Sequence, residues 1–492
     1  MKRALLALIG TSALTLSACS DFEILLGKSD DEVATVVAAT PDTNETAAPI
    51  AVAEDPASGD QPIFIKGADI LAMDGTPAGR GRVLIDDGII VAVGSRLKAP
   101  DDARVIDADG LVLMPGLVDM HVHHFSQEEG PLYLINGITT VRNLWGTNQT
   151  VRLDEGAKYQ NYPGPRVYTP GPLMDGPEPI WGEGSLVVTS PEMARGAVRA
   201  QKAAGFTAVK LYEKLTEEIF VAAVEEAKAA DMQVYAHTPL DMTVDEVIAL
   251  GVDSLEHLNN VQDLLVPDDY AQPDDYNYLE TWAAADNSKM AALAKSFAEA
   301  GVANSVTFEV TINRYAAALD PDAYFASERG QFVPQGLKEW WMQSAERTQA
   351  TATTELIAAA KEKQLAFVKA LYDANAPLLI GTDTPNPFVV AGFSLHGEIE
   401  TFSEAGLPNE AILSLATREA AQFLGQEETF GQVAKGLRAD LILVGGDPEA
   451  DLSVLQNPEA VIASGVYYDR AALDQMRDDA RARAAASYTD DN

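Results

Sequence analysis

The stretch that decides the fold is Met114-Pro115-Gly116-Leu117-Val118-Asp119-Met120-His121-Val122-His123. Pro115-Gly116 punctuates the chain, and the apolar residues after it predict a buried β-strand. His121 and His123 stand two positions apart, so both side chains point to the same face of that strand. Two imidazoles on one face can bind one divalent cation. The strand therefore carries chemistry at its C-terminal end, which is where (β/α)8 barrels place catalytic groups.

Downstream of this strand, strand and helix patterns alternate, which predicts βα units and a parallel sheet. A helix is expected over 217–230, where Ile219, Phe220 and Val224 lie on one apolar stripe. Eight barrel strands are expected near 117–123, 139–143, 166–169, 206–211, 233–237, 254–257, 305–310 and 378–382. The predicted fold class is α/β, with a (β/α)8 TIM barrel over 116–430.

Strand-rich segments flank the predicted barrel. Val83-Leu84-Ile85 and Ile89–Val93 surround Asp86-Asp87-Gly88, which is a hairpin signal. Residues 439–444 and 460–462 have the same strand character. We therefore expect a small β-sandwich module built from residues 61–115 and 431–475, followed by a C-terminal tail over 476–492.

The segments 258–300 and 311–350 exceed ordinary loops. Their large aromatic residues include Tyr270, Tyr276, Tyr278, Trp282, Trp340 and Trp341. Long βα loops at a barrel mouth usually serve function, so lid insertions are expected near 258–350. A solvated insertion with its own small core explains the same pattern equally well.

The N-terminus has the features of a secretory signal. Lys2 and Arg3 precede an apolar run that ends at Leu16 and is shorter than the roughly 20 residues of a membrane-spanning helix. Leu16-Ser17-Ala18-Cys19 resembles the bacterial lipobox, and Cys19 is the one cysteine of the chain. The resemblance implies a signal peptide over 1–18 and a lipid anchor at Cys19, facing the periplasm or the cell exterior. Residues 19–60 lack apolar periodicity and are expected to form a disordered tether.

The composition excludes one class of partner. Asp and Glu number 74 against 35 Lys and Arg, for a formal charge of −39. Such a surface repels nucleic acid. A length of 492 residues suits one large barrel, typically about 250 residues before insertions, plus a smaller module. The oligomeric state is not predicted.

Further motifs follow the opening stretch in order. They are Val209-Lys210-Leu211-Tyr212, Tyr235-Ala236-His237-Thr238, Ser254-Leu255-Glu256-His257-Leu258, Gly381-Thr382-Asp383-Thr384-Pro385 and Ala439-Asp440-Leu441-Ile442-Leu443. Together with the first strand they resemble the amidohydrolase superfamily over about residues 62–470. The pattern is most similar to the imidazolonepropionase-like branch, which includes bacterial prolidases and other dipeptidases.

This resemblance implies a binuclear metal site. By position, His121, His123 and Asp383 would bind one divalent ion, while His237 and His257 would bind a second. Lys210 would bridge them after its neutral amine reacts with carbon dioxide to form a carbamate, which requires a depressed lysine pKa. Nitrogen and oxygen ligands suit zinc, although manganese and iron also fit.

Each of these residues also has a structural explanation. A strand-end histidine can be a hydrogen-bonded core residue, Lys210 a solvated charge and Asp383 a helix cap. His124 should point away from His123 and is left off the metal. Tyr212 shares the face of Lys210 and is a candidate substrate contact.

Four more residues are ambiguous. His396 is either near the substrate or on a helix surface. Asn143 stands where relatives often have aspartate, which puts a catalytic role there in doubt. Arg314 and Arg329 in the insertions are candidates to meet a substrate carboxylate.

The implied reaction is hydrolysis of an amide or peptide bond in a small substrate, such as a dipeptide or an N-acyl amino acid. A metal-activated hydroxide would attack the carbonyl, and Asp383 would pass its proton to the leaving nitrogen. Ester or lactone hydrolysis and deamination remain alternatives on the same site, although a one-metal deaminase would not need Lys210. A non-catalytic lipoprotein that binds metal or ligand is the third alternative.

Overall fold

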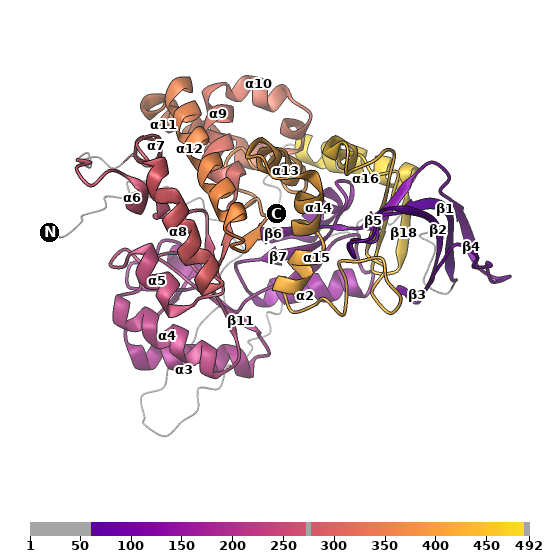
Figure 1. The fold of residues 1–492 in the computed structure, drawn as a ribbon, viewed down its shortest axis with the longest axis horizontal. Coiled ribbons are helices and arrows are strands. Elements are labelled where there is room, and N and C mark those ends of the chain that lie inside the picture. The colour runs from indigo at the N-terminus through magenta and orange to yellow at the C-terminus, as the bar shows by residue number, and fades with distance from the viewer. Residues whose placement is uncertain (1–60, 272–276, 487–492) are drawn as a thin grey trace.

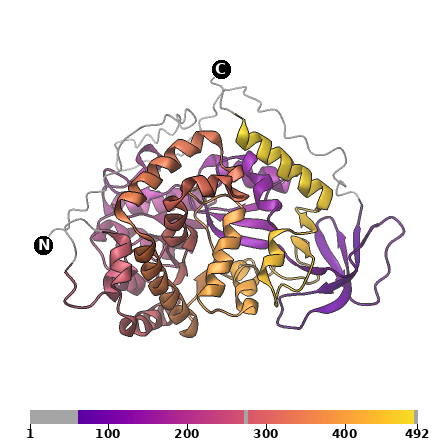
Figure 2. The same cartoon turned by 90° about the horizontal axis from the view of Figure 1, so that it is seen from above.

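The computed structural model describes residues 61–271 and 277–486. The predicted signal peptide, Cys19 and the tether lie outside the described residues, as do Tyr276 and the last six positions of the tail. Helices surround parallel strands in the larger part, and a strand-rich module lies at one end (Figures 1 and 2). None of the helices in the described ranges is both long and apolar enough to cross a bilayer.

The strand-rich module is one eight-stranded sheet with the order β18-β17-β16-β5-β1-β2-β3, and β4 pairs with β1. Its N-terminal strands are β1 (Ile63–Ile70), β2 (Gly79–Asp86), β3 (Ile89–Val93), β4 (Arg104–Asp107) and β5 (Val112–Pro115). Its C-terminal strands are β16 (Leu441–Val444), β17 (Ala460–Ala463) and β18 (Val466–Asp469). Antiparallel pairing of β5 with β16 joins the two ends of the chain in this sheet. Hydrogen bonds connect all eight strands into one sheet, in which β1 pairs with β2, β4 and β5, and the sandwich form of the module stays a prediction.

The hairpin predicted from Asp86-Asp87-Gly88 is confirmed. β2 and β3 pair antiparallel, and Asp86 lies opposite Ile89. The two residues between them, Asp87 and Gly88, have φ of 48° and 70°. An Asp-Gly pair suits such a turn because both central residues must take positive φ.

The larger part contains two parallel sheets. One has the order β6-β7-β8 and the other β10-β9-β11-β12-β13-β14-β15. The strands are β6 (Leu117–Val122), β7 (Ile138–Asn143), β8 (Arg166–Tyr168), β9 (Met174–Asp175), β10 (Leu186–Val187), β11 (Ala208–Leu211), β12 (Gln233–Ala236), β13 (Ser254–Glu256), β14 (Ala303–Ser305) and β15 (Leu378–Leu379). Among the described residues the strands do not pair into one closed sheet. Backbone hydrogen bonds still cross between the two sheets, from Met120 N–H to the carbonyl of Ile380 at 2.9 Å and from Gly171 N–H to that of Ala208 at 3.0 Å.

The expected seventh strand lies too far along the chain, since β14 is Ala303–Ser305, and the expected eighth is too long, since β15 is only Leu378–Leu379. β14 ends at Ser305, and a π-helical turn over Glu309–Asn313 occupies the positions predicted as its end. The chain turns because Thr307 has a φ of 51°. The carboxylate of Glu398 then accepts the N–H groups of Phe308 and Glu309, each at 2.9 Å, and satisfies the start of the turn. Apolar periodicity did not reveal this because the capping residue lies 90 positions away from Phe308.

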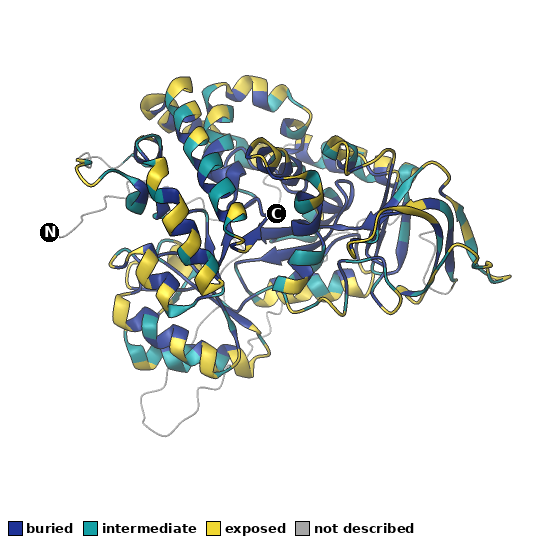
Figure 3. Cartoon of the chain, in the orientation of Figure 1, coloured by how far each residue is buried: buried dark blue, intermediate teal, exposed yellow. Residues whose placement is uncertain are grey.

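Sixteen α-helices are assigned within the described ranges and cover the strands. They are α1 (Gly130–Leu134), α2 (Asn148–Lys158), α3 (Pro191–Ala203), α4 (Glu217–Ala229), α5 (Val244–Leu250), α6 (Val261–Leu265), α7 (Tyr278–Ala283), α8 (Asn287–Ala300), α9 (Arg314–Leu319), α10 (Pro321–Ala326), α11 (Gln335–Thr351), α12 (Thr354–Asp373), α13 (Phe393–Glu404), α14 (Asn409–Leu415), α15 (Arg418–Phe423) and α16 (Arg470–Ala485). Their exposed residues face outward and their buried ones face the strands (Figure 3). α4 confirms the helix predicted over 217–230.

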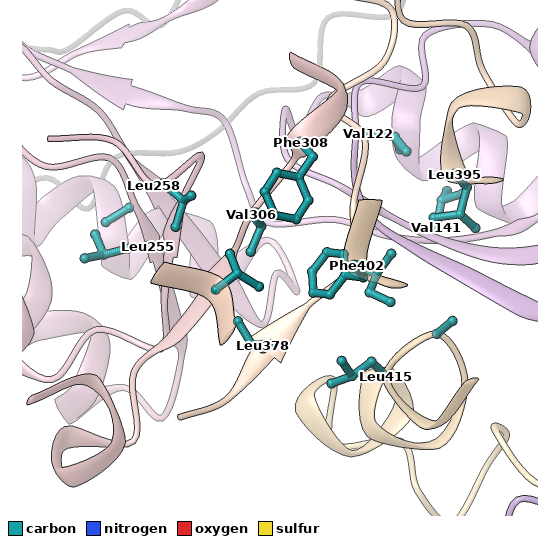
Figure 4. Packing of buried hydrophobic residues seen from close by; sticks show 14 of the residues in the cluster. Val122, Val141, Leu255, Leu258, Val306, Phe308, Leu378, Leu395, Phe402 and Leu415 are labelled. Atoms are coloured by element: carbon teal, nitrogen blue, oxygen red, sulfur yellow. The ribbon is translucent and has the colours of Figure 1, made fainter. Parts of the chain in front are cut away.

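The aromatic residues of the insertions pack into cores. Trp282 belongs to the main hydrophobic cluster, which also contains Val306, Phe308 and Phe402 (Figure 4). Trp341 instead packs in a small separate cluster with Tyr324 and other residues of α9–α11. Residues 311–350 therefore contribute most of a small core that Phe388, Val390 and Ala480 complete from outside the insertion, and their role as a lid stays a prediction.

Candidate functional site

Four histidines meet at the C-terminal ends of the parallel strands. His121 is the penultimate residue of β6 and His123 lies just beyond that strand, while His237 follows β12 and His257 follows β13. The ring centroid of His257 lies 4.4 Å from that of His121 and 4.8 Å from that of His237. The centroids of His121 and His123 are 5.5 Å apart. Strands far apart in sequence thus deliver four imidazoles to one place.

Asp383 joins this cluster from the loop after β15. Its Oδ1 lies 2.8 Å from Nε2 of His123 and 3.3 Å from Nε2 of His121, and its Oδ2 lies 3.8 Å from Nδ1 of His257. His121, His123 and Asp383 form a group, within the described residues, whose ligand atoms all lie close enough to share one ion. The helix-cap explanation of Asp383 fails, because the next helix, α13, begins only after Gly392.

Three of the imidazoles are oriented through Nδ1. Nδ1 of His121 lies 2.8 Å from Glu256, Nδ1 of His237 lies 2.9 Å from Glu213, and Nδ1 of His257 lies 2.9 Å from the hydroxyl of Thr307. A partner at Nδ1 selects the tautomer in which Nε2 is free to bind a metal. None of these three partners is predicted by the sequence patterns. Glu213 and Glu256 stand close to predicted ligands in the chain, but Thr307 carries no local signal.

A buried ion pair anchors Glu256. Both side chains of the pair, Arg142 and Glu256, have no exposed surface, and Nη2 of Arg142 lies 3.1 Å from Oε2 of Glu256. Arg142 also donates to the hydroxyl of Ser254 and to the carbonyl of Met120. Burial alone would raise the pKa of Glu256, but Arg142 and Lys210 hold it well below its usual value. Glu256 is therefore a fixed carboxylate behind His121.

Lys210 is buried at the end of β11. It is 1% exposed, so it is not a solvated strand-end charge. Its Nζ has no hydrogen-bond partner among the described residues. Burial lowers the pKa of Lys210 to about 8, although Glu256 and Asp383 oppose that shift. A neutral amine, which is the form that reacts with carbon dioxide, is thereby made accessible near neutral pH.

The electrostatics of the cluster suit metal binding. Burial lowers the pKa of His123, and it lowers that of His237 and His257 further, which favours the neutral form of these imidazoles. Burial alone would raise the pKa of Asp383, but His257 and His121 hold it well below its usual value. Neutral imidazole and ionised carboxylate are the forms that bind a divalent ion. The unpartnered Nζ of Lys210 and this donor set fit the expected metal, with His121, His123 and Asp383 as one set of ligands.

Some of the other candidate residues lie elsewhere. His124 points away from the cluster, as predicted, and its Nδ1 lies 3.0 Å from Glu129. Asn143 accepts the N–H of His124 at 2.8 Å, so it shapes the chain after β6. His396 is buried on α13, where it interacts with the backbone of Asn136 rather than with the four-histidine cluster.

The candidate substrate-binding residues differ in whether their polar groups already have a partner. The hydroxyl of Tyr212 accepts a hydrogen bond from Nε1 of Trp181 at 2.8 Å, and its ring centroid lies 4.1 Å from that of His237. Arg329 is engaged with Glu309 at 2.9 Å. Arg314 forms no ion pair with a described carboxylate, but it lies close enough to Asp383 for their charges to interact. Tyr212 and Arg314 therefore remain candidates, whereas Arg329 is already paired.

Ligand-type side chains at the ends of parallel strands define a candidate metal-dependent hydrolase. The Amidohydrolase family matches residues 112–467, and the chain belongs to that family.

Solved structures share the fold. A bottromycin amidohydrolase is similar with a TM-score of 0.69 and 24% identity, over 87% of this chain and 92% of that one. A putative prolidase from Bifidobacterium longum is similar with a TM-score of 0.60 and 24% identity, over 85% of this chain and 99% of that one. Similarity at these identities shows the fold alone.

A curated relative is similar over a short segment. The dihydroorotase of Geotalea daltonii is 48% identical over 61 residues, which is 12% of this chain and 14% of that enzyme. The match thus spans about one seventh of the relative's length.

Proposed function

We propose that this chain hydrolyses an amide or peptide bond in a small substrate, on a (β/α)8 barrel with two divalent metal ions. The observation that carries the proposal is Lys210, buried and without a hydrogen-bond partner in the described ranges, within electrostatic range of His237, Glu256 and Asp383. Burying an amine without a hydrogen-bond partner costs free energy. A carbamate on Lys210 would remove this cost by binding the two metal ions, one of which would be held by His121, His123 and Asp383 and the other by His237 and His257.

The barrel form is supported by the backbone hydrogen bonds that cross between the two parallel sheets. Met120 bonds to Ile380, and Gly171 bonds to Ala208. An isolated parallel bridge also joins Val122 to Thr384. These contacts arrange the strand ends around the cluster.

The chain's own residues supply the proton chemistry. When bound, divalent ions lower the pKa of water and polarise a carbonyl oxygen. Asp383 is ionised and touches His121 and His123, so its carboxylate can accept the proton of the attacking water and deliver it to the departing nitrogen. The hydroxyl of Tyr212 already accepts from Trp181, so its own proton is free for a substrate oxygen.

The substrate class follows from the charged groups. Arg314 is the candidate to bind a substrate carboxylate, as in a dipeptide or an N-acyl amino acid, because it has no described carboxylate partner. The prolidase among the structural neighbours is consistent with this class. We also propose that Cys19 anchors the enzyme to a bacterial membrane, facing the periplasm or the cell exterior.

The test is metal analysis beside a substrate screen. We expect two divalent ions per chain, probed with zinc, and hydrolysis of some dipeptide or N-acyl amino acid that a chelator abolishes. Lys210→Ala should lose metal and most activity, and added short carboxylic acids should restore part of it. One tightly held metal in an active Lys210→Ala variant would refute the binuclear site. A deaminase or lactonase would instead be revealed by release of ammonia or by turnover of lactones.

A further inference from the structure

A row of aromatic side chains lies beside the histidine cluster. It consists of Phe125, Trp145, Trp181 and Tyr212, which we call the aromatic row. Ring centroids lie 5.7 Å apart for Phe125 and Trp145 and 5.3 Å apart for Trp145 and Trp181. Trp181 then reaches Tyr212 through its indole N–H at 2.8 Å. The four side chains come from four separate segments, so their contact is a product of the fold.

Both ends of the row touch candidate metal ligands. Phe125 stacks on His123 with centroids 6.2 Å apart, and Trp145 meets the same imidazole edge-on at 5.8 Å. At the other end, the ring of Tyr212 lies 4.1 Å from that of His237. Any substrate group that extends from a bond held at these histidines toward this side meets aromatic carbon.

The indoles of the row are held in place by their own polar atoms. Nε1 of Trp145 donates to the carbonyl of Gly184 at 2.9 Å, and Nε1 of Trp181 donates to Tyr212. The buried core residues Trp282 and Trp341 instead leave Nε1 without a hydrogen-bond partner within the described residues. A Cβ at Gly184 would clash with the indole of Trp145, so this glycine allows the loop to pack on that ring. The row is thus pre-organised before any ligand arrives.

The aromatic row is partly exposed to solvent, unlike a hydrophobic core. Trp181 is 43% exposed, although large apolar side chains are mostly buried in this chain. Its N–H is already used, so the exposed surface of this ring offers apolar contact rather than hydrogen bonds. An exposed aromatic surface that continues to the candidate reaction centre is a surface for a ligand.

We propose that the aromatic row binds an aromatic or large aliphatic side chain of the substrate, next to the bond that is cleaved. The proposal rests on the proposed function for the reaction, but the binding itself does not need turnover. Trp181 is the residue that sets the preference, because it combines exposure with a fixed orientation. Substrates with a small side chain leave this surface in water and lose the contact.

The test compares phenylacetate with acetate as ligands of the metal-loaded protein, by calorimetry. Both share a carboxylate and differ by the phenyl ring, and neither contains an amide. We expect phenylacetate to bind about tenfold more tightly, in line with a single buried aromatic contact. Trp181→Ala should reduce this ratio to about one, whereas Trp181→Phe should retain most of it. The matched control is Tyr159→Ala, since Tyr159 is 66% exposed and outside the row.

Kinetics give a second, separate measurement. On an amide found in the screen, Trp181→Ala should lower kcat/KM for a phenylalanine-containing substrate by about tenfold or more relative to its alanine analogue. Equal binding of phenylacetate and acetate by the wild-type protein, or an unchanged ratio in Trp181→Ala, would overturn the aromatic row as a subsite. A ring preference that depends on Trp181, without hydrolysis of any amide, would retain the row and refute the proposed reaction.

Discussion

Glu256→Gln tests whether the buried carboxylate behind His121 controls metal binding. The substitution keeps the size of the side chain and one oxygen, but removes the charge that holds Nδ1 of His121 at 2.8 Å. A neutral amide is a weaker acceptor and can also present its NH2 group to the ring, which disturbs the tautomer that frees Nε2. Loss of such a partner typically costs 10–100-fold in metal affinity, or about 1.4–2.7 kcal/mol.

The same change also affects stability. Arg142 has no exposed surface and would lose its carboxylate partner. Breaking one side of a buried ion pair costs about 3–5 kcal/mol. A control must therefore separate lost stability from lost metal affinity.

Asp440→Asn is that control, because Asp440 is also buried and pairs with Arg438 just before β16 rather than with an imidazole. Zinc affinity is measured for both variants by competition with a chromophoric chelator, at a temperature where both are folded. We expect Glu256→Gln to lose at least tenfold and Asp440→Asn less than about threefold. Equal affinities in the two variants would refute the orienting role of Glu256.

Three further predictions concern single residues. Asp383→Asn should lower turnover of the metal-replete protein by roughly 10²–10⁴-fold with a modest loss of metal, and activity within a few-fold of wild type would reject the proton shuttle. Burial lowers the pKa of His396 to about 4. As the pH falls, His396 therefore takes up a proton near pH 6.5 in the unfolded chain but only near pH 4 in the folded chain. Folding stability is lost between these two pH values. Between pH 7 and pH 5 the contribution of His396 to this loss is about 2 kcal/mol, so the free energy of unfolding should fall by about that much more in wild type than in His396→Leu. Parallel curves for the two proteins would contradict the assignment, and a loss of activity in His396→Leu would favour a substrate role. Cys19→Ser should release the protein from membranes or block its processing, and failure of labelled fatty acid to enter the wild-type protein would exclude the anchor.

Local patterns in the sequence predicted several features of the fold. The Asp87-Gly88 turn was predictable because positive φ at two successive positions limits which residues fit. The opposite directions of His123 and His124 follow from the alternation of side chains along an extended chain. α4 was predictable from the spacing of its apolar residues. Each of these depends on neighbours within a few residues.

The end of the seventh strand shows where local patterns fail. Ser305 to Val310 is apolar enough to be a strand, yet Thr307 turns the chain and Glu398 satisfies the N–H groups of the following turn. That carboxylate comes from α13, so no window around Thr307 contains it. The outcome matters for the site, because the same turn places the Thr307 hydroxyl on His257.

The sequence by itself determined the alternating strands and helices, and it proposed the ligand types at the strand ends. Only the tertiary structure decided what surrounds them: Arg142 behind Glu256, the unpartnered Nζ of Lys210, and the aromatic row from Phe125 to Tyr212. The physical reason is that hydrophobic periodicity and the residue preferences of turns depend on a few neighbouring residues. Burial and side-chain pairing instead depend on which strands become neighbours in the fold. Arg142 and Glu256 are 114 residues apart, and their contact exists only once β7 and β13 face the same interior.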